Sequence, residues 1–320
     1  MEAELLAAIY AAPDDDAPRL VYADWLQDRG DSYGELIALQ LQGVTGPRVD
    51  ALLQEHEARA IGSLASQVRW AKLERGFPAS CEAKPGADPR DPCWATVHHV
   101  WGVELLADDA PLPWLRRLDA RDLHIAALRR LARPLAIETL VWHMDDDLPQ
   151  TGALARLAIL PALRRLEISD ERRFLPLLER RWAHPDELGW LGAAPILGHL
   201  HQLALRIDVS QLAAWLVRFT PTSIQRLELA DPGVDPWRVL VARDAAGGLG
   251  ELAIHLPATP PPPAAFNRFG DAMVAGLLSL SRSQLSSARI VGATEATVDT
   301  VARLERRLQT QTRVRKIVIE

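Results

Sequence analysis

The stretch Asp14–Asp31, DDDAPRLVYADWLQDRGD, contains six aspartates in eighteen residues and is the first place where the sequence could form a metal site. An EF-hand calcium loop needs glycine at its sixth position and glutamate at its twelfth. Counted from the first aspartate, those positions hold Arg19 and Trp25. Consecutive acids before a proline are typical of a helix start. The stretch therefore predicts helix capping by Asp15 or Asp16.

Two other groups of residues have metal-binding side chains. The run Asp145–Asp147 follows a predicted strand and is also interpreted as capping. A functional role is less strongly excluded for this run than for Asp14–Asp16. Cys81, Cys93, His98 and His99 have the spacing C-x11-C-x4-H-H, whereas zinc modules use closely spaced cysteine pairs. We therefore predict no metal site and no cofactor.

Catalytic sequence motifs are absent from the chain. It has no G-x-S-x-G, no P-loop, no H-E-x-x-H and no dinucleotide fingerprint. His199 and His201 share one face of a predicted strand without an evident third ligand, which favours a structural or partner-contacting role. An enzyme, or a subunit of one, remains the alternative hypothesis, with a loop-built site at Asp145–Asp147 and His143.

The composition is that of a folded protein. The 320 residues are 48% hydrophobic and 24% charged, a balance unlike that of intrinsically disordered proteins, which have few hydrophobic residues. No apolar run approaches the roughly 18 residues of a membrane helix, and the acidic start MEAELLAAIY is unlike a signal peptide. Two cysteines suit a reducing compartment, and a disulfide between them is not needed. We expect a cytoplasmic protein with no membrane partner.

Helices are expected in the first 75 residues. Leu5, Leu6, Ile9 and Tyr10 share one helical face, and Pro13 ends that element. The helix that follows should bury four residues and end at a left-handed Gly30. Those four residues are Val21, Tyr22, Trp25 and Leu26.

Two further helices complete this region. Ser32 and Glu35 match a capping box, which predicts a third helix beginning at the serine. A fourth, longer and more polar helix is expected over about residues 48–74.

The segment APDDDAPRLVYADWLQDRGDSYGELIALQLQ resembles the repeat-companion domain of bacteria such as myxobacteria and planctomycetes. The run R-L-V-Y-A-D-W-L followed by R-G-D and G-E-L-I carries the similarity, which lies within the first 42 residues. The resemblance implies a short N-terminal module ahead of leucine-rich-type repeats. It also implies the motif Arg75-Gly76-Phe77 where the repeats start, and no biochemical activity.

A repeated pattern, L-x-x-L-x-(apolar), predicts parallel strands in the rest of the chain. The pattern begins at Leu115, Ile137, Leu163, Leu200, Ile224, Leu249, Ser286 and Val314. Its common step lies in the leucine-rich range of about 20 to 29 residues, and helix-like segments separate the strands. At Ser286 the register slips by one, because Ile290 is the residue expected inside. The only asparagine, Asn267, is in a helix-like segment, so the array is irregular.

The expected fold class is therefore α/β, with two domains. A small N-terminal helical module occupies residues 1–75. An irregular leucine-rich-repeat-like solenoid with a curved parallel sheet occupies residues 76–320.

In each strand the third, fifth and seventh residues of the pattern are expected on the open face of the sheet. Mixed charges in these positions suit a protein partner better than a phosphate backbone. The predicted partner-binding residues of this face are Arg117, Asp119, Arg121, His143, Arg165, Glu167, Arg206, Arg226, Glu228 and His255.

The insertion at residues 172–200 adds Trp182 and Trp190 as candidate interface anchors. Packing of both indoles inside the lengthened repeat is the alternative.

The sequence thus favours a non-catalytic scaffold or adaptor that binds an unknown protein. The net charge of −6 argues against general nucleic-acid binding. The last strand, in VRKIVIE, offers an edge for self-association.

Overall fold

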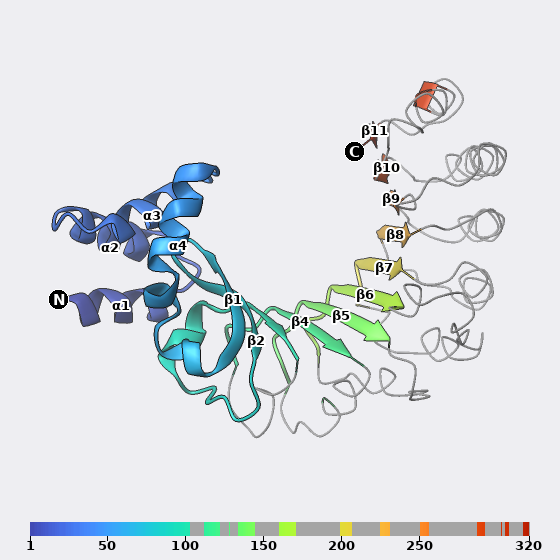
Figure 1. The fold of residues 1–320 in the computed structure, drawn as a ribbon. Coiled ribbons are helices and arrows are strands. Elements are labelled where there is room, and N and C mark those ends of the chain that lie inside the picture. The colour runs from blue at the N-terminus through green and yellow to red at the C-terminus, as the bar shows by residue number, and fades with distance from the viewer. Residues whose placement is uncertain are drawn as a thin grey trace, which may run out of the picture. The chain divides into compact units, whose positions relative to one another are not determined.

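The computed structural model describes residues 1–102, 112–121, 128, 134–144, 160–170, 199–206, 225–230, 250–255, 287–291, 302, 305–306 and 316–319. The architecture is α/β, with an N-terminal helical region followed by mostly parallel strands (Figure 1). The chain divides into two compact units, Met1–Ala120 with Arg130–Ile137 and Arg121–Arg129 with Glu138–Glu320. These units are defined by compactness and not by type of structure. The predicted boundary at residue 75, between a helical module and the repeats, therefore stays a prediction.

The first two predicted helices are confirmed as α1 (Glu2–Ala11) and α2 (Ala17–Gln27). Asp16 is the N-cap of α2 and makes no side-chain cap bond, whereas the carboxylate of Asp15 accepts the N–H of Ala17 at 2.9 Å. Gly30 adopts a φ of +73°, the left-handed conformation expected beyond the end of a helix.

The buried face of α2 differs in part from the prediction. Tyr22 and Leu26 are buried and Trp25 is partly buried, but Val21 is 56% exposed. Arg19 takes the inward position instead and is only 1% exposed. The inward residues follow the spacing of a helix that packs on one side against its neighbours, and this spacing places Arg19 inside and Val21 outside.

Helix α3 (Ser32–Leu41) begins at the predicted serine, but its N-cap is not the residue that the capping box predicts. Asp31 is the N-cap, and its carboxylate accepts a backbone N–H at 3.0 Å. The Ser32 hydroxyl instead lies 2.8 Å from Nε2 of His56, and Glu35 pairs with Arg48. The predicted capping box is therefore wrong, because the aspartate occupies the cap and leaves both side chains to tie α3 to α4.

The fourth helix is shorter than predicted. Helix α4 (Pro47–Ile61) ends at Gly62, whose φ is +54°, and the 3-10 helix η1 (Gly62–Ser66) follows. The residues expected to continue it form strand β1 (Val68–Glu74), which pairs antiparallel with β2 (Phe77–Ala83). Pairing with β2 supplies β1 with hydrogen bonds that an isolated segment lacks, so local pattern alone misassigns it.

The turn between β1 and β2 docks this hairpin onto the helices. Arg75 and Gly76 have φ values of +54° and +82°, as a two-residue hairpin turn requires. Gly76 donates its N–H to the Gln40 side chain at 2.7 Å, and its carbonyl accepts from Tyr33. A Cβ on Gly76 would lie 2.3 Å from Cγ1 of Ile37. Only glycine fits, which gives the Arg75-Gly76-Phe77 motif a physical reason.

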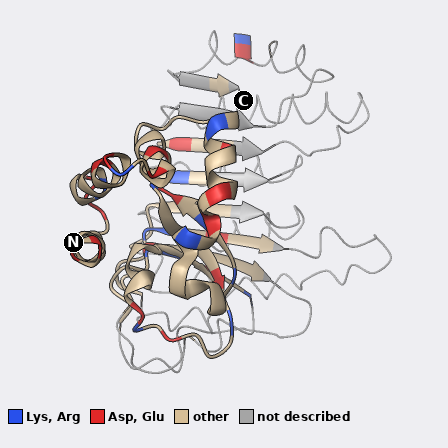
Figure 2. Cartoon of the chain, turned by 60° about the vertical axis from the view of Figure 1, so that its left-hand side comes forward, with Lys and Arg blue, Asp and Glu red and all other residues tan. Residues whose placement is uncertain are grey.

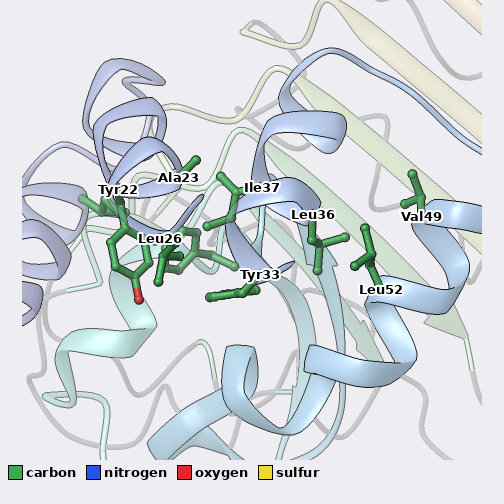
Figure 3. Close-up of a cluster of buried hydrophobic side chains, with 10 residues drawn as sticks. Tyr22, Ala23, Leu26, Tyr33, Leu36, Ile37, Val49 and Leu52 are labelled. Atoms are coloured by element: carbon green, nitrogen blue, oxygen red, sulfur yellow. The ribbon is translucent and has the colours of Figure 1, made fainter. Parts of the chain in front are cut away.

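The helices share one hydrophobic core with Phe77 of β2. Figure 3 shows the members of this core from α2, α3 and α4. Each fully buried large apolar side chain contributes about 1.5–3 kcal/mol. The buried members are Ile9, Tyr22, Ala23, Leu26, Tyr33, Leu36, Ile37, Val49, Leu52 and Phe77. Because this core includes Phe77, the hairpin and the helices stabilise each other.

Parallel pairing begins at β2. Strand β2 pairs with β3 (His99–Trp101), which follows the 3-10 helix η2 (Pro92–Thr96), and β3 pairs with β4 (Arg117–Arg121). Strand β3 was not predicted, because three residues are too short to show the repeat pattern.

The second unit contains the remaining strands in chain order. They are β5 (Thr139–Met144), β6 (Arg165–Asp170), β7 (Gln202–Arg206), β8 (Arg226–Ala230), β9 (Glu251–His255), β10 (Ser287–Val291) and β11 (Lys316–Ile319). Together with β4 they confirm a strand at every occurrence of the repeat pattern. The helix-like segments predicted between them lie mostly outside the described residues.

The slip of register at β10 is also confirmed. Ala288 pairs with Leu252, and Ile290 pairs with Ile254. Ile290 therefore occupies the position of the inward-facing sixth residue. Among the helices that the structure describes, none is long and apolar enough to cross a membrane.

Candidate functional site

The parallel register of the second unit aligns the predicted open-face residues into rows across the strands. From β5 to β9 the strands pair without a shift relative to the repeat pattern. Residues at the same position of the pattern are therefore direct neighbours on adjacent strands. The third positions form the row Thr139, Arg165, Gln202, Arg226 and Glu251. The fifth positions form the row Val141, Glu167, Ala204, Glu228 and Ala253.

Polar contacts run along and between these rows. Arg165 donates to Oε1 of Gln202 at 3.0 Å and lies 3.4 Å from the carboxylate of Glu167. Arg226 lies 3.7 Å from the carboxylate of Glu251 on the next strand. Basic and acidic residues therefore occupy neighbouring strands, as Figure 2 shows.

The fifth-position row is less open than expected. Val141 and Ala204 are buried, and Glu167 is only 7% exposed. Neighbouring strands lie about 4.8 Å apart, so the longer third-position side chains can cover their fifth-position neighbours. Partner contact is consequently expected at the third-position row, where Arg165 and Arg226 keep about a quarter of their side chains exposed.

An ion-paired carboxylate, Asp119, lies on β4, the last strand of the first unit. Asp119 is 2% exposed, and Arg117 donates to both of its oxygens, at 2.9 and 3.2 Å. Nε2 of His99 lies 3.0 Å from the same carboxylate, an ion-pair distance without the alignment of a hydrogen bond. Burial alone raises the pKa of Asp119, but His99 and Arg117 outweigh it and hold that pKa below its usual value.

Two tryptophans extend this face, and the sequence did not indicate them. Trp70 pairs with Glu82 across β1 and β2, Glu82 with Trp101, and Trp101 with Asp119. Trp70 is 41% exposed and donates its indole N–H to Glu82 at 3.0 Å. The two indole rings meet at 65° with centroids 6.4 Å apart. Trp70 was missed because its segment was assigned to a helix.

The other predicted partner-binding residues are only partly described. Arg121 is exposed at the end of β4, and His143 is half-buried in β5. Only the backbone is described for Arg206, Glu228 and His255. Trp182, Trp190 and Asp145–Asp147 lie outside the described residues.

The cysteines and histidines of the possible metal cluster are described. Cys81 and Cys93 are both free thiols, and burial raises the pKa of Cys81 to about 12. Cys93 accepts a hydrogen bond from Ser63 at 3.2 Å. In the part of the chain that the structure describes, no three His, Cys, Asp or Glu side chains gather as a metal site.

Comparison with known proteins adds no assignment. No protein-family model matches the chain, and no curated protein sequence is significantly similar to it.

Proposed function

We propose that the chain is a non-catalytic scaffold of the cytoplasm that holds a protein partner on its strand face. In this proposal a repeat-companion module precedes an irregular leucine-rich-repeat-like solenoid. The in-register third-position row is the observation that carries the proposal. It presents Arg165, Gln202, Arg226 and Glu251 on four neighbouring strands of one sheet.

The arrangement of charge favours a protein over a nucleic acid. Arg165 and Arg226 each lie near a carboxylate, so their charge is partly neutralised within the face. Binding to phosphates depends on clusters of unneutralised Lys and Arg. Alternating charges suit a surface with complementary alternating charges, because such a pattern fixes the register between two proteins.

Affinity purification from the native host, followed by titration of the purified partner, tests the proposal. The variant R165Q/R226Q removes both positive charges without placing new carboxylates beside Glu167. The matched control R29Q/R90Q removes two charges from residues outside the strand face. We expect the first variant to weaken binding at least about tenfold, since desolvated charge pairs contribute several kcal/mol.

The control is expected to bind within about twofold of the parent protein, because exposed charges outside the interface contribute little to binding. Equal affinity of all three proteins would contradict the strand-face proposal. Circular dichroism of each variant establishes that the fold is retained. Self-association through β11 is a separate proposal, and sedimentation of the purified chain tests it.

A further inference from the structure

The face formed by β1 to β4 alternates aromatic and acidic side chains. The strand register makes neighbours of Trp70, Glu82, Trp101 and Asp119, one from each strand. Trp rings attract cations to their faces more strongly than other aromatic rings do. A carboxylate beside each ring strengthens that attraction, so the row has the chemistry of a site for a cation.

Elsewhere in this unit, aromatic rings already have a cation from the chain itself. The guanidinium of Arg29 lies 4.3 Å from the ring centroid of Trp25, and that of Arg59 lies 4.9 Å from that of Tyr33. Among the described residues, no arginine or lysine lies over the ring of Trp70 in this way. Trp70 therefore offers an exposed ring that an arginine from outside the chain can cover.

The charge of this part of the chain also favours a cation. Residues 1–120 contain 20 Asp and Glu but only 11 Lys and Arg. Acidic residues are prominent on the helices near the N-terminus (Figure 2). An acidic surface attracts basic partners and accelerates their association.

We propose that the corner between Trp70 and Trp101 binds an arginine side chain from a basic segment of the protein partner, an inference that rests on the proposed scaffold function. The guanidinium stacks on the indole of Trp70 and donates to the carboxylate of Glu82. That carboxylate now pairs with Arg69 at 2.8 Å. The Arg69 side chain is 56% exposed, and such a surface pair contributes little, so an incoming arginine can replace it.

Arginine fits this corner better than lysine. Its planar guanidinium stacks flat on an aromatic ring and can donate two parallel bonds to one carboxylate. The ammonium group of lysine is a compact, strongly hydrated charge that cannot do both. The structure thus points to an arginine-bearing peptide and not to any cation of equal charge.

Calorimetric titration of the full chain with three capped hexapeptides tests the proposal. One peptide contains two arginines between glycines and serines, the second has lysines in their place, and the third has citrullines. Citrulline keeps the planar shape without the charge. We expect the arginine peptide to bind at least about fivefold more tightly than the lysine peptide, and the citrulline peptide to bind more weakly still.

Substitution of Trp70 separates the corner from general attraction to an acidic protein. W70A removes no charge, so non-specific attraction to a protein of net charge −6 survives it. We expect W70A to weaken binding of the arginine peptide about tenfold and W70F to restore part of the loss. The matched control V21A changes another exposed apolar residue, on α2, and should leave the affinity unchanged.

Three results would overturn the inference: no measurable binding of the arginine peptide, equal binding of the arginine and citrulline peptides, or full affinity in W70A. These results leave the scaffold proposal standing if R165Q/R226Q still weakens binding of the purified partner. If R165Q/R226Q instead binds the purified partner as tightly as the parent protein does, while the peptide results are as expected, the proposed function is contradicted and the inference is not.

Discussion

The helical region and the strand face use the same residue types in opposite ways. Around the helical core, Arg59 lies over Tyr33 and Arg19 lies over Phe77 of β2, with the aromatic rings inside the core. On the strands, Trp70 has a similar capacity for a cation but remains 41% exposed. Aromatic and charged groups that are satisfied within the chain stabilise the fold, whereas those left accessible are available to a partner. The comparison predicts that substitutions in the first region reduce stability and those in the second reduce binding.

The largest expected loss of stability follows removal of Phe77. This residue is 3% exposed and joins the hairpin to the helical core. F77A should lower the free energy of unfolding by about 4 kcal/mol, the usual cost of deleting a buried phenyl ring. Urea unfolding followed by circular dichroism measures this loss. A change below about 1 kcal/mol would show that the hairpin and the helices are energetically separate.

Gly76 should have the next largest effect. G76A places a Cβ against Ile37 and forces alanine into a φ of +82°, so we expect a loss of about 3 kcal/mol. G30A is the matched control, because Gly30 has a φ of +73° but no atom within 4 Å of the added Cβ. That control should cost about 1 kcal/mol. Equal unfolding midpoints of the two variants would contradict the close approach of the turn to α3.

Asp119 combines features of both regions, because it belongs to the strand face but is buried like the residues of the helical core. D119N removes the charge that Arg117 binds through two contacts, and we expect a loss of about 2 kcal/mol at pH 7. The folded-state pKa of Asp119 is lowered, so its stabilisation is complete above the unfolded-state pKa of about 4. It disappears as the pH falls through the folded-state pKa.

Unfolding of D119N and the parent protein across a range of acidic pH measures this dependence. The difference in stability should be constant above about pH 5 and should shrink below about pH 4. A difference that grows on acidification would contradict the stabilising role of the Arg117 and His99 contacts.

Trp70 should have the smallest effect on stability. W70A removes a half-exposed ring and its edge contact with Trp101, at a cost of about 1 kcal/mol. Thermal unfolding monitored by circular dichroism measures it. A loss as large as that of F77A would mean that Trp70 belongs to the core and would end the distinction between the two regions.

The sequence predicted the strands well where one physical signal repeated. Alternating apolar residues located all the strands from β4 to β11, and equal positions in the pattern proved to be neighbours in the sheet. The slip at β10 was predictable for the same reason, since only the correct register places Ile290 beside Ile254.

Other features depended on contacts that a sequence pattern does not contain. Irregular pairing shifts the register of β1 near Val68 and again near Leu73, so its buried residues do not alternate. The segment consequently looked helical, and the Trp70 corner was missed. Arg19 was not among the predicted inward residues of α2, but packing turns it inward, where it donates to the backbone of Asp15 at 2.9 Å. The buried fifth-position row likewise depends on the lengths of its neighbours' side chains.

Photo-crosslinking to the purified partner tests the central proposal most directly. A photoreactive residue in place of Gln202 lies in the third-position row, beside Arg165. The matched control replaces Gln54, an exposed residue of α4. If the strand face holds the partner, crosslinks form from position 202 and not from position 54. Crosslinks from position 54 alone would contradict the account.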